Sequence, residues 1–501
     1  MADNLFTRIL QANPDKARTF IMPQDRTAMS YGDAFEAAAR FAHVLARHGV
    51  KPGDRVAVQV EKSPEALLLY LACLQLGAIY LPLNTDYTAN ELGYFAGDAE
   101  PSVFVASPKT QEKIGGFFPP DRILTLGEDG NSGSLIEEAR GAPGAFSPVA
   151  PSMSDLAAIL YTSGTTGRSK GAMLSHGNLY SNAASLMKAW RYTSDDVLLH
   201  ALPIFHTHGL FVATNTTLLS SAAMIFLPKF NLDAMIAGLR HASVMMGVPT
   251  FYTRLLSDPR LNQDCTRNIR LFISGSAPLL AETHREWQQR TGHAILERYG
   301  MTETNMNTSN PYDGERRPGS VGLPLPGVEV RIAGKDGEAV APGEIGMIEV
   351  RGPNVFSGYW RMKEKTAAAF RADGFFITGD LGTKDANGYV SIVGRDNDMI
   401  ITGGFNVYPK EVEALIDALP GVEEAAVVGL PHKDFGEGVT AFVVAKKGEA
   451  VSEDAIMAAL AGQLAKFKLP KRVIVLGELP RNTMGKVQKS LMRKDYAGLY
   501  A

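Results

Sequence analysis

The segment from Tyr161 to Gly171 concentrates more chemistry than any other stretch of this chain. It reads Tyr-Thr-Ser-Gly-Thr-Thr-Gly-Arg-Ser-Lys-Gly and follows a short apolar run, 156–161, that is typical of a buried strand. Glycines let the backbone approach a ligand, amides and hydroxyls donate to phosphate oxygens, and Lys170 adds positive charge. The segment therefore predicts an oligophosphate site, although an exposed linker rich in small residues is the alternative. It is not a Walker A loop, because the required Gly-Lys-Ser/Thr spacing is missing.

Two later segments are candidates for the walls of a pocket. Phe205-His206-Thr207-His208-Gly209 ends an apolar run, and Ser274-Gly275-Ser276-Ala277-Pro278-Leu279 reads as a strand end that turns into a helix. Two histidines at this spacing could ligate a metal, but further ligands are not evident nearby, so lining a pocket or packing in the core is favoured. Small residues in the second segment leave room for a flat ligand, although an ordinary strand-to-helix turn explains that segment taken alone.

The second half of the chain carries three motifs suited to a nucleotide. Glu297-Arg298-Tyr299-Gly300-Met301-Thr302-Glu303 offers an aromatic face for a base, a hydroxyl for phosphate and a carboxylate for Mg²⁺. Thr378-Gly379-Asp380 and Gly394-Arg395 suit a ribose, since carboxylates hold its hydroxyls in nucleotide folds. Pro480-Arg481-Asn482-Thr483-Met484-Gly485-Lys486 places a lysine behind a glycine. Each motif alone is explained by a turn or a surface lysine; their combination indicates function.

Composition limits the classes of protein that could carry these motifs. The chain has 501 residues, of which 45% are hydrophobic and 21% charged, and its net charge is -3. This is typical of a globular protein with more than one domain, and it argues against a general binder of nucleic acid or anionic membranes. Two cysteines, Cys73 and Cys265, provide neither a disulfide framework nor a zinc spacing. Together with an N-terminus that lacks a targeting signal, they favour a cytoplasmic location.

Short apolar runs alternate with helix-length amphipathic segments through most of the chain, which predicts α/β architecture. The longest apolar stretch, 66–83, is interrupted by Gln75, Gly77 and Pro82, so we expect a buried helix that passes into a strand. Strands are expected at 55–60, 103–106, 197–202, 223–227, 244–248 and 271–274, and helices at 31–48 and 232–241.

The character of the sequence changes near residue 328. Strand-like runs at 328–332, 345–350 and 389–393 are separated by Asp-Gly and Asn-Gly turns, which predicts an antiparallel β subdomain. After 394–398, helices at 410–419 and 453–466 and strands at 424–428, 440–444 and 472–475 are enough for a small α+β lid. We therefore expect an N-terminal domain at 1–395, built from two α/β subdomains and the β subdomain. A hinge at 396–398 and a mobile C-terminal domain at 399–501 would follow.

In their order and spacing, these motifs closely resemble the superfamily of adenylate-forming enzymes, which contains acyl- and aryl-CoA synthetases, adenylation domains and luciferases. The resemblance covers nearly the whole chain, and chance agreement of all the motifs is negligible. It implies a two-step reaction. A carboxylate attacks the α-phosphorus of ATP to give an acyl-adenylate and diphosphate, and the thiol of coenzyme A then attacks the carbonyl and expels AMP.

The resemblance also implies roles for individual residues. The set expected to bind ATP is Thr162, Ser163, Gly164, Thr165, Thr166, Gly167 and Lys170 at the β- and γ-phosphates, Ser276, Ala277 and Tyr299 at adenine, and Asp380 and Arg395 at the ribose. Glu303 would hold Mg²⁺. Thr302 would touch phosphate, and Lys486 would bridge the attacking carboxylate and the α-phosphate, where negative charge develops. His206 is expected to act with them in catalysis.

A domain rotation is part of the same resemblance. Asn397 falls at the family's hinge, where Asp or Lys is common, so this chain departs from the pattern there. Rotation would remove Lys486 from the site and present the loop containing Gly404 to coenzyme A. Acylation of Lys486 would remove its charge, which makes a protein acetyltransferase and deacetylase candidate partners and an off-switch plausible.

Arg298 suggests which acid is used. Many relatives have an uncharged residue before the tyrosine, whereas a guanidinium facing a closed pocket needs an anion. A short dicarboxylate supplies one, and malonate is the smallest; the pocket motifs resemble the malonyl-CoA synthetase subfamily. Arg298, His208, Thr207, Ser276 and Met306 are therefore the predicted acid-binding residues. The alternative for Arg298 is a structural salt bridge to Glu297 or Glu282.

Other functions remain open on the sequence alone. A related synthetase would act on a short monocarboxylate, methylmalonate or succinate. An adenylation domain of a peptide synthetase would load a carrier protein instead of coenzyme A. A nucleotide sensor on the same fold would be expected to lose Lys486 or Glu303, and both are present.

Overall fold

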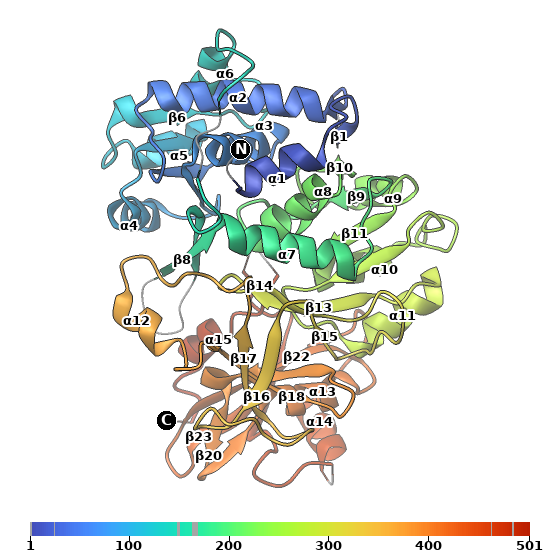
Figure 1. The fold of residues 1–501 in the computed structure, drawn as a ribbon. Helices are drawn as coiled ribbons and strands as arrows, with labels where there is room; N and C mark the ends of the chain where they lie inside the picture. The colour runs from blue at the N-terminus through green and yellow to red at the C-terminus, as the bar shows by residue number, and fades with distance from the viewer. Residues whose placement is uncertain are drawn as a thin grey trace.

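The computed structural model of this protein describes residues 3–24, 26–147, 151–162, 169–461, 463–482 and 485–500. Figure 1 shows a large N-terminal region, coloured blue to yellow, and a smaller C-terminal region, coloured orange to red. The predicted α/β fold with a small C-terminal domain is confirmed.

Two mixed sheets dominate the N-terminal region. The first has the order β6 (Ile123–Thr125), β5 (Val103–Ala106), β3 (Arg55–Gln59), β4 (Ile79–Pro82), β7 (Leu156–Thr162) and β8 (Lys170–Ser175). The second has the order β15 (Leu323–Pro324), β14 (Asn305–Ser309), β13 (Leu296–Met301), β12 (Leu271–Ser274), β11 (Val244–Gly247), β9 (Val197–His200), β10 (Ala223–Phe226), β1 (Thr19–Pro23) and β2 (Met29–Ser30). Its central strands, from β13 to β1, run parallel, so their carboxyl ends lie at one edge.

The remaining two sheets are smaller. The β subdomain is an antiparallel sheet of β16 (Glu329–Ala333), β17 (Gly346–Arg351), β18 (Phe376–Lys384) and β19 (Val390–Arg395). The C-terminal sheet has the order β21 (Phe405–Val407), β20 (Ile400–Thr402), β23 (Gly436–Ala445) and β22 (Val422–His432), with β24 (Arg472–Leu476) parallel to β23. The short 3₁₀ turn η3 (Asp396–Asp398) connects them, at the residues where the sequence predicts a hinge.

Helices cover the sheets in both regions. The N-terminal ones are α1 (Leu5–Ala12), α2 (Tyr31–Arg47), α3 (Pro64–Leu76), α4 (Ala89–Ala99), α5 (Pro108–Ile114), η1 (Pro120–Arg122), α6 (Ser134–Ala139), α7 (His176–Ala189), the π-helix η2 (His208–Asn215), α8 (Thr216–Leu219), α9 (Leu232–Leu239), α10 (Pro249–Leu256), α11 (Ala281–Thr291) and α12 (Lys363–Ala368). The C-terminal ones are α13 (Pro409–Asp417), α14 (Glu453–Leu460) and α15 (Lys489–Asp495).

The long apolar stretch forms a buried helix and a strand, as predicted. Ser63 caps α3 through a bond from the Ala66 amide, Pro64 occupies the first turn, and Gly77 ends the helix in the left-handed conformation. All residues of α3 are buried, and β4 follows directly. Among the described residues, no helix combines the length and hydrophobicity that a membrane crossing requires.

One predicted helix is wrong in its length. The sequence predicts a helix over 453–466, whereas α14 ends at Leu460 and Ala461 takes an extended conformation. Gly462, which follows, lowers helix propensity at this point.

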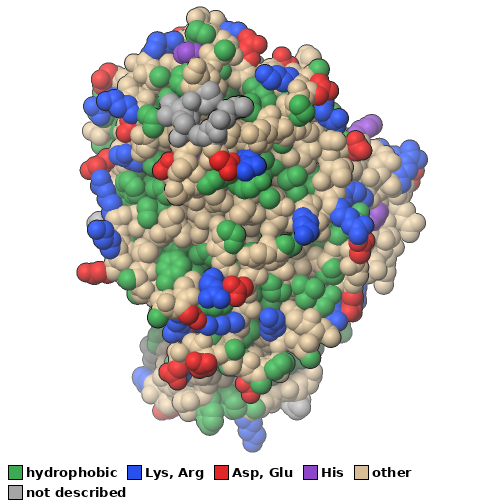
Figure 2. Space-filling view, in the orientation of Figure 1, with side chains coloured by type: hydrophobic (Ala, Val, Ile, Leu, Met, Phe, Trp, Pro, Cys, Tyr) green, Lys and Arg blue, Asp and Glu red, His purple; other side chains and the backbone are tan. Residues whose placement is uncertain are grey.

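Figure 2 shows Lys and Arg side chains interspersed with Asp and Glu over the viewed face, in keeping with the near-balanced charge of the chain.

Candidate functional site

The predicted site residues of the large region follow the carboxyl ends of neighbouring parallel strands. His206 to His208 come after β9, Ser276 and Ala277 after β12, and Thr302 and Glu303 after β13. Thr250 follows β11 at the start of α10. Ligands of open α/β sheets bind at such an edge, because the loops there are free to diverge around a cleft. The fold thus brings together segments that are far apart in sequence.

Arg298 lies on β13, one of these strands, and is 3% exposed. Its Nε and Nη2 atoms have no hydrogen-bond partner among the described residues. The guanidinium lies against Gly275, where an added Cβ would stand 2.4 Å from Cζ. Burial lowers the pKa of Arg298 to about 9. A buried guanidinium left in this state is costly, and an anionic ligand would satisfy it.

Other orphaned polar atoms belong to the segment that follows β9. Thr207 Oγ1 and His208 Nε2 are buried without a partner among the described residues. His208 Nδ1 lies 3.2 Å from the Oγ atom of Ser276, whose φ of +72° is in the left-handed region. Burial lowers the pKa of His208, and Arg298 adds to the effect. We call Arg298, Gly275, Thr207 and His208 the Arg298 pocket.

The structure contradicts the salt-bridge alternative for Arg298 among the described residues. Successive residues of a strand point to opposite faces, so Glu297 and Arg298 diverge on β13. A Glu297 oxygen accepts a bond from the Gly319 amide at 3.3 Å, and Glu282 pairs with Lys446 at 2.9 Å. Neither carboxylate neutralises the guanidinium.

A second group of contacts surrounds Asp380 on β18. The hydroxyl of Tyr299 donates to its Oδ2 atom at 2.5 Å, and Arg395 Nε pairs with its Oδ1 atom at 2.7 Å. Residues 380 and 395 are direct partners in the β18–β19 ladder, which sets this geometry. Burial raises the pKa of Asp380, an effect that Arg395 opposes. The sequence-predicted base and ribose residues are thus in mutual contact.

A third group of contacts surrounds Glu303. The hydroxyl of Tyr359 donates to Glu303 Oε1 at 3.0 Å, and Lys170 Nζ lies 4.4 Å from the centre of the Tyr359 ring. Burial raises the pKa of Glu303, while Tyr359, Arg395 and Lys170 oppose the shift.

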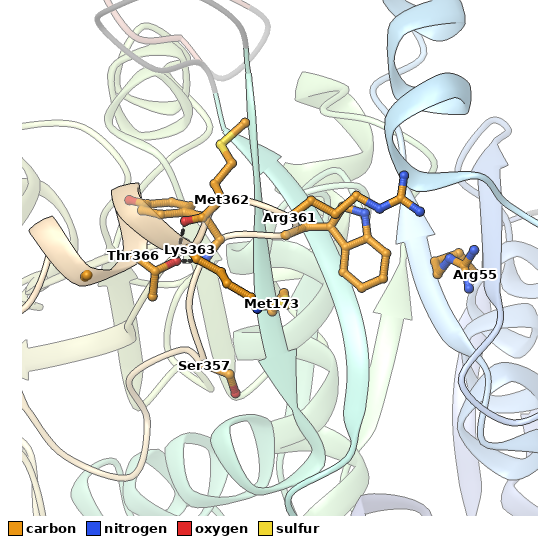
Figure 3. A pocket seen from close by; sticks show the side chains of 10 residues that line it. Arg55, Met173, Ser357, Arg361, Met362, Lys363 and Thr366 are labelled. Atoms are coloured by element: carbon orange, nitrogen blue, oxygen red, sulfur yellow. Dashed lines mark hydrogen bonds between the residues drawn. The ribbon is translucent and has the colours of Figure 1, made fainter.

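A cavity of about 580 Å³ opens beside Tyr359, lined by Met173, Trp360 and Arg361 among others (Figure 3). None of the predicted site residues lines it.

Lys486 joins these groups from the C-terminal region. Its amide donates to Asn482 Oδ1 at 3.0 Å, and Arg481 donates to the Gly485 carbonyl at 2.6 Å while pairing with Glu424. Gly485, with a φ of +73°, faces Thr250, whose nearest side-chain atoms would be 3.3 Å from an added Cβ. We call the described residues 481, 482 and 485–487 the Lys486 loop.

The Lys486 ammonium lies within electrostatic reach of every other group. Burial lowers its pKa, the positive charges of Arg395 and Arg298 add to this, and Asp380 and Glu303 oppose it. The Lys486 side chain is exposed where the two regions meet, beside the contact of Gly485 with Thr250, and we call this junction the cleft. Burial together with the positive charges of Lys486 and Arg298 lowers the pKa of His206 to about 3, which keeps its imidazole neutral.

Some predicted residues are placed less centrally or not described. Ser163, Gly164, Thr165, Thr166 and Gly167 lie outside the described residues, while Thr162 and Lys170 pair at the ends of β7 and β8. Met306 packs behind Gly300, where an added Cβ would stand 2.6 Å from its Cε atom. Gly404 is exposed in the turn between β20 and β21, and no described contact joins it to the Lys486 loop.

Sequence reasoning missed two residues that contact this site. Tyr359 bonds Glu303 and packs on Lys170, and Thr250 touches Gly485. Tyr359 follows a glycine and precedes a tryptophan, and a lone aromatic in that setting predicts packing rather than a site. Thr250 follows the proline that begins α10, a position common to many helices. Only the fold reveals either contact.

Two family comparisons match most of the chain. The AMP-binding enzyme family matches residues 6–360, and the AMP-binding enzyme C-terminal domain matches residues 411–486. This chain belongs to the AMP-binding enzyme family. Its predicted class, an AMP-forming CoA ligase, is confirmed by these matches together with the relatives that follow.

Three similar proteins each match 89% or more of this chain. The crystal structure of ATP-bound MatB from Rhodopseudomonas palustris is 58% identical, covers 100% of each chain and has a TM-score of 0.98. A malonate–CoA ligase of Arabidopsis thaliana is 35% identical and covers 89% of this chain and 79% of its own. A feruloyl-CoA synthase of an Amycolatopsis species is 36% identical and covers 94% of each. The malonate–CoA ligase and the feruloyl-CoA synthase are about equally similar to this chain in sequence, so these two relatives do not decide the acid, which must be inferred from the pocket.

Proposed function

We propose that this chain is a malonate–CoA ligase. It converts ATP, malonate and coenzyme A to malonyl-CoA, AMP and diphosphate through a malonyl-adenylate. The observation that carries the proposal is the Arg298 guanidinium, which is buried at the carboxyl edge of the second sheet with two nitrogens unpartnered among the described residues. One carboxylate of malonate pairs with Arg298, and the other is activated.

The shape of the Arg298 pocket supports a small diacid over a large one. The guanidinium is in contact with Gly275, so it fills the space that a longer acid would need there. His208 Nε2 and Thr207 Oγ1 are further polar atoms that lack partners among the described residues and suit a carboxylate. Electrostatic coupling of His208 to Arg298 supports their facing one ligand. The malonate–CoA ligase of Arabidopsis thaliana is in keeping with this choice.

Lys486 supplies the charge for the first step. Its ammonium interacts electrostatically with Arg298, Asp380, Arg395 and Glu303. In this position it bridges the attacking carboxylate and the α-phosphate, where negative charge grows as the adenylate forms. Tyr299 stacks on the adenine, and Asp380 with Arg395 holds the ribose. Neutral His206 donates to the reacting carboxylate without adding charge.

Glu303 suits a magnesium ion on the phosphate side. Its carboxylate is buried, one oxygen accepts from Tyr359, and burial raises its pKa, so a nearby cation would stabilise the charged form. Among the described residues no cluster of three or more metal-ligating side chains exists. That fits Mg²⁺, which commonly binds one or two carboxylates together with substrate phosphates. Bound there, it would neutralise charge on the phosphates.

The second step uses a different arrangement of the two domains. We propose that domains 1–395 and 399–501 rotate about η3, that Lys486 leaves the cleft, and that the exposed turn containing Gly404 replaces it on the path of coenzyme A. Acylation of Lys486 by an acetyltransferase would block only the first step, because only that step needs its charge.

Acid-dependent exchange of diphosphate into ATP tests the substrate directly. The panel contains malonate, methylmalonate, succinate, acetate and ferulate, measured with the wild type and with Arg298→Ala. We expect malonate to have the highest kcat/KM in the wild type. Arg298→Ala should lower it by roughly 10²–10³-fold, the cost of leaving a buried carboxylate without its partner, and leave acetate unchanged or improved.

The panel also has outcomes that reject the proposal. Equal losses for malonate and acetate in Arg298→Ala would mean that the guanidinium is structural. A wild type that prefers ferulate or acetate would reject malonate while leaving the adenylating residues in place. Coenzyme A is then added to the preferred acid, and failure of AMP release would indicate a carrier protein as the acceptor.

A further inference from the structure

One buried lysine, Lys62, is not part of the proposed chemistry. Lys62 follows β3 and is 9% exposed. Its Nζ atom lies 3.0 Å from His200 Nδ1 and 2.9 Å from the His200 carbonyl oxygen, and 4.2 Å from the centre of the Phe226 ring. The ammonium therefore directs its donors to one histidine and one aromatic face.

Burial of Lys62 lowers the stability of the folded protein, so packing alone does not explain why a lysine occupies this position. The hydrogen bonds found for Lys62 among the described residues go to His200 and not to an acidic side chain, and burial lowers the pKa of Lys62 well below the usual value. A buried cation without a counterion generally costs stability, and apolar residues of similar volume often replace such groups without loss. The hydrogen bonds of Lys62 to His200 therefore point to a requirement other than stability.

His200 connects Lys62 to Gly209, the residue after His208 of the Arg298 pocket. Its Nε2 atom lies 2.9 Å from the Gly209 carbonyl oxygen, which can only accept, so Nε2 carries the proton and Nδ1 accepts from Lys62. Gly209 follows His208 in the first turn of the π-helix η2. Its carbonyl also accepts from Thr214 Oγ1 at 3.0 Å. Short π-helical segments frequently occur at functional sites.

We propose that Lys62 is a positioning residue for the acid pocket: through His200 it holds the Gly209 carbonyl and so orients His208 toward the acid. Lys62 favours the same tautomer of His200 as the Gly209 carbonyl does, and it holds the ring plane because it bonds the ring and the backbone of one residue. The inference rests on the proposed function only in taking His208 as a ligand of the acid. It does not depend on which acid is bound.

Tyr70 provides a matched control for a general loss of stability in the π-helix η2. Tyr70 donates to Asn215 Oδ1 at 3.2 Å, at the opposite end of η2, and is also fully buried. Tyr70→Phe removes one buried hydrogen bond to η2 and leaves Lys62, His200 and Gly209 in contact. A general effect of η2 stability would appear in this variant as well.

The kinetic test compares Lys62→Met, Lys62→Gln and Tyr70→Phe, using the best acid of the wild-type panel. We expect Lys62→Met to raise KM for the acid about tenfold or more, because a small displacement of a positioned group is costly, and to leave KM for ATP unchanged. Lys62→Gln keeps a donor for His200 and should recover part of the loss. In a cycle with His208→Ala, the two effects should not add, since both act on one contact.

A second measurement needs no variant. Nitrogen-15 NMR of histidine-labelled wild type should show His200 protonated at Nε2, with Nδ1 as acceptor, in the free enzyme. Protonation at Nδ1 would overturn the proposal, as would equal increases of KM for ATP and acid, or the same change in Tyr70→Phe. Full additivity with His208→Ala would also overturn it. Because the tautomer and the KM ratio are read on whichever acid is used, failure of the malonate assignment leaves this test intact.

Discussion

The residues of the Arg298 pocket lie on or after buried strands of the second sheet, whereas Arg481, Asn482 and Lys486 in the Lys486 loop are exposed. Residues of β9, β11 and β12 belong to the large apolar core of the N-terminal region, with β11 and β12 wholly buried. The C-terminal region packs two apolar cores of its own, around Val427 and Phe442. Between the regions, the ion pair of Lys446 with Glu282 is largely exposed.

This difference shows how one site can serve two reactions. A pocket built into a continuous core is pre-organised, and its orphaned polar atoms stay in place whether or not an acid is bound. A region with its own cores can move as a body when its contacts across the cleft are weak. Selection of the acid is therefore expected to be a property of the N-terminal region, while the identity of the reaction step depends on where the C-terminal region lies.

The largest effect that separates the two regions is expected from Lys486→Ala. Loss of this ammonium should lower the rate of adenylate formation by roughly 10²–10³-fold, because a charge that meets the developing anion is removed. The loss should be the same for malonate and acetate, since Lys486 touches the common reacting group. Single-turnover formation of the adenylate from each acid measures it.

The thiol step provides the control for Lys486→Ala. Synthetic malonyl-adenylate supplied with coenzyme A should be converted at nearly the wild-type rate, because the proposed second arrangement has no place for Lys486. A comparable loss in this half-reaction would contradict the assignment of the lysine to one step.

Gly275→Ala should have a smaller effect, restricted to the acid. A Cβ at this position would stand 2.4 Å from the Arg298 Cζ atom, so the guanidinium must shift. We expect KM for malonate to rise about tenfold to a hundredfold, with acetate and ATP little changed. Gly97→Ala is the matched control, because a Cβ there meets nothing within 4 Å. A uniform fall for both acids would show that Gly275 serves the backbone alone.

Local patterns predicted most of the fold and the identity of the site segments. The strands at Val103–Ala106 and Leu271–Ser274 agree with prediction to the residue, because short apolar runs bounded by turn residues have few alternatives. The end of α14 was missed, because the predicted helix ran past Gly462 to residue 466. Helix ends depend on single residues more than on the apolar pattern.

Contacts between distant segments could not be predicted in the same way. Arg298 could be identified from the sequence, but its lack of a carboxylate partner could not. That lack arises because Glu282 pairs with Lys446 and Glu297 accepts from a backbone amide. Tyr359 meets Glu303 only because the segment after β17 folds back across β8. The roles of the predicted site residues thus stay predictions, although the fold brings most of the described ones into one cleft.

The smallest effect is expected from the contact that joins the two regions. Lys446 Nζ and Glu282 Oε1 are 2.9 Å apart, with side chains 43% and 56% exposed, and exposed pairs contribute about 0.2–1 kcal/mol. Lys446→Ala should therefore lower the rate of adenylate formation at most about fivefold, by making the arrangement with Lys486 in the cleft less populated. Diphosphate exchange at low ionic strength measures this change.

Salt and a neighbouring lysine distinguish this contact from a general surface effect. The difference between Lys446→Ala and the wild type should shrink at high ionic strength, because screening already weakens the pair in the wild type. Lys447→Ala, one residue further along and exposed, should behave as the wild type. Exchange of the charges in the double variant Lys446→Glu, Glu282→Lys should restore the rate. Equal losses of activity in both lysine variants, or a difference that salt leaves unchanged, would show that this ion pair does not hold the two regions together. The contact of Gly485 in the Lys486 loop with Thr250 would then be the one that holds the small domain against the large region.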